Sequence, residues 1–208
     1  MSTSEPIAVA ILAKAPIPGL AKTRLIPTLG REGAARLQSR LIARTLVTAC
    51  AAEIGPVSLW ATPEESHFQQ LARQFPIKLA LQPGGDLGMR MHAAIEAACP
   101  AIVIGTDCPA LEPKHLQAAG DALREGADAT IIPAEDGGYV LIGLRLPQPT
   151  LFTDMTWGTE TVMAETRRRA AQLGLALREF AALWDVDMPE DLARLRAAGF
   201  GDFVPKSC

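Results

Sequence analysis

Five short apolar runs recur along the chain, and each is bounded by glycine, proline or aspartate. Runs of this length and composition are typical of buried strands. They cover residues 7–13, 57–61, 78–82, 101–106 and 129–133. Between them, apolar side chains return at helical spacing, notably over residues 34–49 and 87–98. This alternation predicts an α/β fold built on a mostly parallel sheet.

A sixth apolar run, residues 139–144, follows the fifth after only Glu135-Asp136-Gly137-Gly138. A link this short permits a hairpin but excludes a helical crossover. The sequence therefore predicts a three-layer α/β/α arrangement around a mixed sheet with one antiparallel strand. Later helices are expected over residues 160–173 and 189–198, the second opening with proline and acids. We expect residues 1–208 to form one domain, because the composition suits a full core and no linker is visible.

The bulk properties exclude several classes of function. A formal net charge of −3 predicts no general attraction to nucleic acid or to anionic membranes. No apolar run is long enough to span a bilayer, and the N-terminus lacks the layout of a signal peptide, so a cytoplasmic protein is expected. The cysteines, at positions 50, 99, 108 and 208, have no paired spacing, which predicts neither disulfides nor a zinc site. Cys108 is expected to be a small buried thiol.

The first predicted strand runs into a loop with the composition of an anion cradle. It contains Lys14, Lys22 and Arg24 together with two prolines and Gly19. Proline stiffens the loop, glycine admits backbone amides close to a ligand, and the cations can neutralise phosphate oxygens. It is not a P-loop, because that motif places glycine and lysine side by side. A solvated basic loop is the alternative interpretation.

The fourth predicted strand runs into Gly105-Thr106-Asp107-Cys108-Pro109, which puts a carboxylate at the tip of the strand. Ligands of open α/β sheets bind outside the carboxyl ends of the strands. Asp107 suits Mg²⁺ or Mn²⁺, and since Mg²⁺ takes one or two protein carboxylates with phosphate oxygens and water, a partner is expected. Asp187 is the first choice for that partner, and Asp185 is held in reserve. An aspartate in this position can also simply cap a turn.

The Asp136-Gly137-Gly138 segment permits two interpretations. Asp-Gly-Gly is common hairpin-turn chemistry. As a functional segment, its glycines would let an acceptor approach the backbone while Asp136 accepts hydrogen bonds or acts as a general base. Trp157 offers an aromatic wall for the acceptor, or else packs in the core.

Five segments, taken in order, resemble a known family. The family is the glycosyltransferase-A-like proteins related to 2-phospho-L-lactate guanylyltransferase and the molybdenum cofactor nucleotidyltransferases. The matching segments are KAPIPGLAKTRL (14–25), GDLGMRM (85–91), GTDCP (105–109), DGGY (136–139) and DVDMPEDL (185–192). The chain departs from the classical nucleotidyltransferases in lacking a Gly-x-Gly-x-x-x-Arg first loop, and Met188 stands where threonine is common.

The resemblance implies a Rossmann variant of the nucleotide-diphospho-sugar transferase type. It implies that Lys22 and Arg24 contact phosphates and that Asp107 with Asp187 holds the metal. It also implies a nucleotide site in which Gln82 and Gly85 lie near the base. The other residues expected in that nucleotide site are Lys14, Gly19 and Thr106.

Two reactions fit this set of residues. In glycosyl transfer from a nucleotide-diphospho-sugar to a small acceptor, Asp136 takes the proton of the acceptor hydroxyl. In nucleotidyl transfer an acceptor phosphate attacks the α-phosphorus, and pyrophosphate leaves toward Lys22 and Arg24. Glycosyl transfer is placed first for two reasons. The first loop differs from that of the classical nucleotidyltransferases, and members of the family are often labelled glycosyltransferases. A non-catalytic nucleotide-binding module is disfavoured, because binding alone needs no metal pair and third acid. The Gly-x-Gly-x-x-Gly and Gly-x-Ser-x-Gly motifs of dinucleotide oxidoreductases and serine hydrolases are absent.

Overall fold

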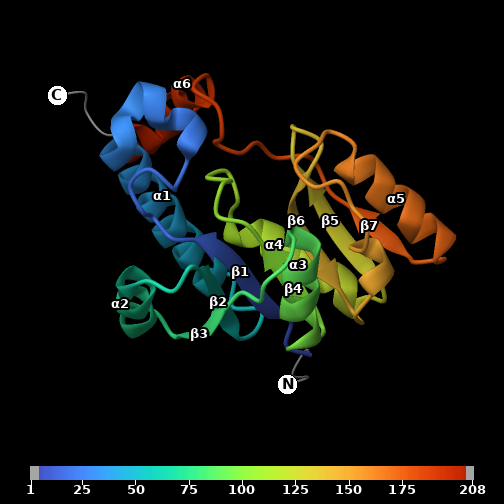
Figure 1. The fold of residues 1–208 in the computed structure, drawn as a ribbon. Coiled ribbons are helices and arrows are strands. Elements are labelled where there is room, and N and C mark those ends of the chain that lie inside the picture. Colours follow the sequence, from blue (N-terminus) through green and yellow to red (C-terminus); the bar gives the residue numbers. More distant parts are fainter. Residues whose placement is uncertain (1–4, 205–208) are drawn as a thin grey trace.

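The computed structural model describes residues 5–204, and within them one mixed sheet contains seven strands (Figure 1). The strand order is β3-β2-β1-β4-β6-β5-β7. The strands are β1 (Ala8–Lys14), β2 (Val57–Thr62), β3 (Ile77–Leu81), β4 (Ala101–Ile104), β5 (Ala129–Pro133), β6 (Tyr139–Leu144) and β7 (Leu177–Glu179). Strand β6 is antiparallel to both β4 and β5, and the other pairs are parallel. The predicted mixed sheet with one antiparallel strand is confirmed.

Helices cover both faces of this sheet, which confirms the predicted three layers. The helices are α1 (Ile26–Ala51), α2 (Ser66–Gln74), α3 (Leu87–Glu96), α4 (Pro113–Arg124), α5 (Val162–Gln172) and α6 (Asp191–Leu195). Successive residues of a strand point to opposite faces. In β1, Val9 and Ile11 therefore join one core with side chains of α1, α2 and α4, whereas Ala8 and Ala10 join the other with α3 and α5.

A third apolar cluster fastens the C-terminal segment to the start of the chain. It unites Leu25, Leu37 and Leu41 with Trp184 and Val186 of the segment before α6. Figure 1 shows α6 beside α1, at opposite ends of the sequence colouring. This packing brings residues 184–187 back toward the loop that follows β1.

The structure contains three elements that the sequence did not predict, and the ends of two predicted elements lie elsewhere. Helices α2 and α4 and strand β7 were not predicted, and β7 is a three-residue edge strand with only Leu177 apolar. The last α-helix begins at Asp191 rather than at residue 189, and π-helical turns replace it over Arg196–Phe200, where Gly199 has φ 88°. Strand β4 ends at Ile104, earlier than the predicted residue 106. Strand β7 and the ends of helices and strands carry few apolar residues, so periodicity does not define them. Helix α4 was missed although Leu116, Ala119 and Leu123 have helical spacing.

Within residues 5–204, no helix combines the length and the apolar character that crossing a bilayer requires. Cys50, Cys99 and Cys108 are free thiols, and Cys108 is buried as expected. Cys208 and residues 1–4, which entered the cysteine and signal-peptide expectations, lie outside the described residues.

Candidate functional site

A cavity of about 880 Å³ opens at the carboxyl ends of β1 and β4. Strand β1 has β2 on one side and β4 on the other, so the strand order reverses its direction here. Such a reversal leaves a crevice at the carboxyl ends of the strands. The residues singled out from the sequence that line it are Lys14, Lys22, Arg24, Gln82, Thr106, Asp107, Asp136, Asp185 and Asp187. The sheet thus gathers distant segments at one edge.

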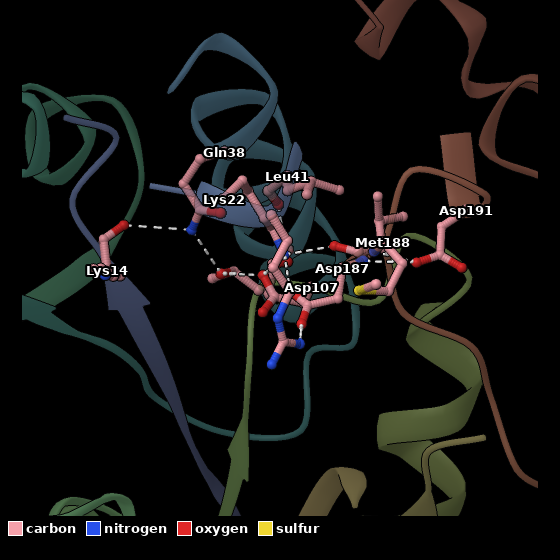
Figure 2. Close-up of polar contacts among 12 residues, drawn as sticks. Lys14, Lys22, Gln38, Leu41, Asp107, Asp187, Met188 and Asp191 are labelled. Carbon is pink, nitrogen blue, oxygen red and sulfur yellow. Dashed lines mark hydrogen bonds and ion pairs between the residues drawn. The ribbon is translucent and has the colours of Figure 1, made fainter. Parts of the chain in front are cut away.

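Asp107 and Asp187 both meet the ammonium group of Lys22 (Figure 2). The Lys22 Nζ lies 2.7 Å from Asp107 Oδ1 and 3.6 Å from Asp187 Oδ1. It also donates to the Val186 carbonyl oxygen at 2.6 Å, and the lysine side chain is only 3% exposed. Two carboxylates 80 positions apart in the chain therefore converge on a single cation, as their pairing in the sequence analysis requires.

Backbone hydrogen bonds hold the 183–187 segment beside the ends of β4 and β5. The amide of Val186 donates to the Asp107 carbonyl oxygen at 2.8 Å, and the amide of Leu183 donates to the Pro133 carbonyl oxygen at 2.9 Å. Lys22 itself has a left-handed backbone, with φ 46° and ψ 49°. That conformation costs a residue with a Cβ roughly 1–2 kcal/mol, and strain of this kind collects at functional sites.

Asp187 is oriented by further partners. Arg24 Nη1 donates to Asp187 Oδ2 at 2.6 Å, from a guanidinium that is largely exposed. Asp191 Oδ2 accepts hydrogen bonds from the backbone amides of Asp187, at 2.8 Å, and of Met188, at 2.6 Å. Asp191 thus caps the turn that carries Asp187.

Two cations of the cavity have no carboxylate partner within residues 5–204. They are Lys14, at the end of β1, and Arg90, in α3. Arg90 donates to the Gly85 carbonyl oxygen at 3.2 Å and to Gln82 Oε1 at 3.4 Å. These two side chains can meet an anionic ligand without first leaving an ion pair.

Two polar side chains of the cavity, Arg90 and Gln38, were not predicted from the sequence. Arg90 lies inside GDLGMRM, one of the segments that carried the family resemblance, so its signal was present. Gln38 is a nearly buried amide on the apolar face of α1, and it donates to Thr106 Oγ1 at 3.1 Å and to the Lys14 carbonyl oxygen at 3.4 Å. A polar residue within an apolar helical stripe was the available signal.

Asp136 and Asp185 also line the cavity, and they form no ion pair within the described part of the chain. Burial, together with the nearby carboxylates of Asp136 and Asp107, raises the pKa of Asp185 to about 6. Asp136 Oδ1 accepts a hydrogen bond from the Gly138 amide at 2.9 Å, as in an Asx turn. The buried thiol of Cys108 also lines the cavity, and burial raises its pKa to about 12, which keeps it protonated.

Several predicted ligand contacts do not line the cavity: Gly19, Gly85, Gly137, Gly138 and Trp157. The hairpin-turn interpretation accounts for Gly137, where a Cβ would lie 2.3 Å from the Glu160 carbonyl oxygen. Trp157 packs against the core of the α3 and α5 face, and its ring stands edge-on to Tyr139 at 6.3 Å between centroids. Tyr139 is the member of this pair that lines the cavity.

Gln82 lines the cavity, but its amide nitrogen is already engaged. Its Nε2 donates to the Trp60 carbonyl oxygen at 2.7 Å and to the Ala13 carbonyl oxygen at 3.2 Å. The side chain therefore ties β3 to β1 and β2. Its Oε1 is the atom left to face Arg90 or a ligand.

The chain is similar to proteins named as nucleotide-diphospho-sugar transferases and nucleotidyltransferases. A protein from Desulfovibrio desulfuricans G20, provisionally named a nucleotide-diphospho-sugar transferase, has a TM-score of 0.82 and 26% identity, covering 94% of this chain and 89% of its own. Rv0371c from Mycobacterium tuberculosis, solved in complex with manganese, has a TM-score of 0.52 over 91% of this chain and 97% of its own. At 16% identity, that likeness shows the fold alone.

Phosphoenolpyruvate guanylyltransferase from Rubrobacter xylanophilus is 31% identical over 134 residues. The match spans 64% of this chain and 62% of the relative, which is less than two thirds of the relative's length. The family model for uncharacterised proteins conserved in bacteria, DUF2064, matches residues 45–159. The chain belongs to this family, and the family resemblance read from the sequence is confirmed.

Proposed function

We propose that the protein is a nucleotidyltransferase that depends on a divalent metal ion. It would transfer a nucleoside monophosphate from a nucleoside triphosphate to a small phosphorylated acceptor and release pyrophosphate. The observation that carries the proposal is the convergence of Asp107 and Asp187 in a cavity that also presents two cations without a carboxylate partner in residues 5–204. The sequence analysis placed glycosyl transfer first, and a guanylyltransferase relative at 31% identity supports the reverse order.

Asp107 and Asp187 are the residues that would hold Mg²⁺ or Mn²⁺. The position of Lys22 shows that these residues suit a cation. Its ammonium group lies between the two carboxylates and the Val186 carbonyl oxygen. No cluster of three or more histidine, cysteine or acidic side chains suited to a metal occurs in residues 5–204. Mg²⁺ accepts such a sparse protein site when phosphates and water supply its other ligands. When bound, the ion neutralises charge on the phosphates.

The cations of the cavity would contact the phosphates at different stages of the reaction. Lys14 and Arg90, which have no carboxylate partner in the described chain, are proposed to hold the triphosphate in the resting complex. Lys22 and Arg24, which begin in contact with the aspartates, are proposed to stabilise the negative charge that develops on pyrophosphate as it leaves. A positioned cation acts on such charge more strongly in a partly desolvated cavity than in water.

Lys14→Met is expected to weaken binding of a non-hydrolysable GTP analogue, with Mg²⁺ present, about tenfold, or ~1.4 kcal/mol. The melting temperature should change little, because Lys14 forms no ion pair within residues 5–204. Isothermal titration calorimetry measures the affinity. Lys78→Met is the matched control, because Lys78 is an exposed lysine of β3 outside the cavity. Equal losses in the two variants would show that Lys14 acts only through net charge.

The reaction itself is tested by product analysis. The protein is incubated with Mg²⁺, each nucleoside triphosphate in turn beginning with GTP, and a panel of small phosphorylated acids. We expect pyrophosphate release that requires both the acceptor and the metal. In parallel, UDP- and GDP-sugars are offered with hydroxyl acceptors, and nucleoside diphosphate is measured. Release of a nucleoside diphosphate from the sugar donors, without pyrophosphate release from the triphosphates, would refute nucleotidyl transfer.

Glycosyl transfer is the second candidate, and two acidic residues that line the cavity favour it. Asp136 and Asp185 form no ion pair in the described part of the chain, so they would repel a phosphorylated acceptor placed beside them. A neutral hydroxyl acceptor could instead donate a hydrogen bond to Asp136 and lose its proton there. The provisional name of the Desulfovibrio structure agrees with this alternative.

A further inference from the structure

Lys22 is placed as a metal ion would be placed rather than as a phosphate contact. Its Nζ has three oxygens within 3.6 Å, from Asp107, Asp187 and Val186. The lysine side chain is 3% exposed, while the Asp107 and Asp187 side chains are 47% and 40% exposed. Solvent and ligands can therefore reach the carboxylates, whereas the ammonium group is enclosed behind them.

We propose that Lys22 is a resident counter-ion that a divalent metal ion must displace. The inference rests on the proposed function for the identity of the competing ion. An ion held between Asp107 and Asp187 would share carboxylate oxygens with the Lys22 ammonium group, which lies 2.7 Å from Asp107 Oδ1 and 3.6 Å from Asp187 Oδ1. Two cations that close repel one another strongly, so metal and lysine exclude each other from the carboxylate pair.

The backbone around Lys22 indicates how the exchange would occur. Ala21 and Leu25 are both buried and anchor the loop on either side of the lysine. The exchange is therefore a rotation of the lysine side chain rather than an opening of the loop. Lys14, Arg24 and Lys22 all line one cavity, so the released ammonium group would enter the region proposed for the phosphates.

This exchange couples the metal to the nucleotide. A metal ion that binds alone must leave the Lys22 ammonium group without its carboxylate partners. A bound triphosphate gives the released lysine new oxygen partners, and so favours the metal. Because linkage is reciprocal, the metal must strengthen nucleotide binding by the same factor.

The decisive variant is Lys22→Met, which keeps most of the length of the side chain and removes its charge. Mn²⁺ binding to nucleotide-free protein is followed by electron paramagnetic resonance of the free ion. We expect the variant to bind Mn²⁺ about tenfold more tightly than the wild type, or better. Lys14→Met removes the same charge from the same cavity without touching the aspartates, so its effect should stay below about threefold. Equal or weaker Mn²⁺ binding by Lys22→Met overturns the inference.

A measurement on the wild type covers the case in which Lys22→Met does not fold. Reductive methylation modifies accessible lysine amines, and mass spectrometry reports each site. Lys22 should react slowly without metal and several-fold faster with Mg²⁺, while exposed Lys78 and Lys114 react equally in both. An unchanged rate at Lys22 overturns the inference. If wild type and Lys22→Met both fail to bind Mn²⁺ even with GTP present, the proposed function is wrong as well. If both bind Mn²⁺ but Lys22→Met binds it no more tightly than the wild type, only the Lys22 inference is wrong.

Discussion

Asp107→Asn is expected to lower turnover about 10³-fold and to remove the metal dependence of nucleotide binding. The substitution keeps the size and position of the side chain at the end of β4 but replaces an anionic oxygen with a neutral amide. Mg²⁺ binds neutral amide oxygen weakly in a site with so few protein ligands. Steady-state kinetics on the identified substrate, with nucleotide titrations at several Mg²⁺ concentrations, provide the measurement.

The same substitution should also lower stability, because it leaves the enclosed ammonium group of Lys22 without its nearest carboxylate. Since Asp107 is about half exposed, water screens the pair, and we expect a loss of about 1–2 kcal/mol rather than the larger value of a fully buried pair. The double variant Asp107→Asn with Lys22→Met should recover most of this stability and none of the activity. Recovery of activity in the double variant would mean that Asp107 serves only to neutralise Lys22.

The parts of this fold that the sequence predicted are those set by strong local patterns. Apolar runs bounded by turn residues located most of the strands, and the four-residue link before Tyr139 required the antiparallel hairpin. The position of Asp107 was predictable, because it follows β4 and the carboxyl ends of the parallel strands lie at the edge of the sheet where ligands bind. Asp187 was harder, because its position depends on the apolar contacts of Trp184 and Val186 with α1.

The sequence could not show which partner each polar side chain takes. Lys22 was expected to meet phosphate, yet it is enclosed by oxygens of the chain itself. Gln82 was expected near a base, yet its nitrogen ties two strands together. Both arrangements depend on segments far away in sequence, and no local periodicity encodes them. Strand β7 escaped prediction for a related reason, because it is short and gains its order by pairing with β5.

Gly137→Ala is expected to destabilise the protein by about 3 kcal/mol or more. Gly137 has φ 92°, a conformation that residues with a Cβ rarely adopt. An added Cβ would lie 2.3 Å from the carbonyl oxygen of Glu160 and 2.4 Å from its Cα, and backbone atoms cannot rotate away as a side chain can. The Gly137 carbonyl oxygen also accepts a hydrogen bond from the amide of Met163, at 2.8 Å, so the hairpin and the start of α5 would be forced apart.

Urea denaturation measures the loss, and Gly126→Ala separates its two causes. Gly126 has φ 106°, but an added Cβ there meets nothing within 4 Å, so that variant should lose only the roughly 1–2 kcal/mol of backbone strain. The excess in Gly137→Ala then reports the collision with Glu160. If instead Gly137→Ala unfolds no more easily than Gly126→Ala while substrate binding is lost, the glycine serves the approach of a ligand, and the packing explanation for this hairpin is wrong.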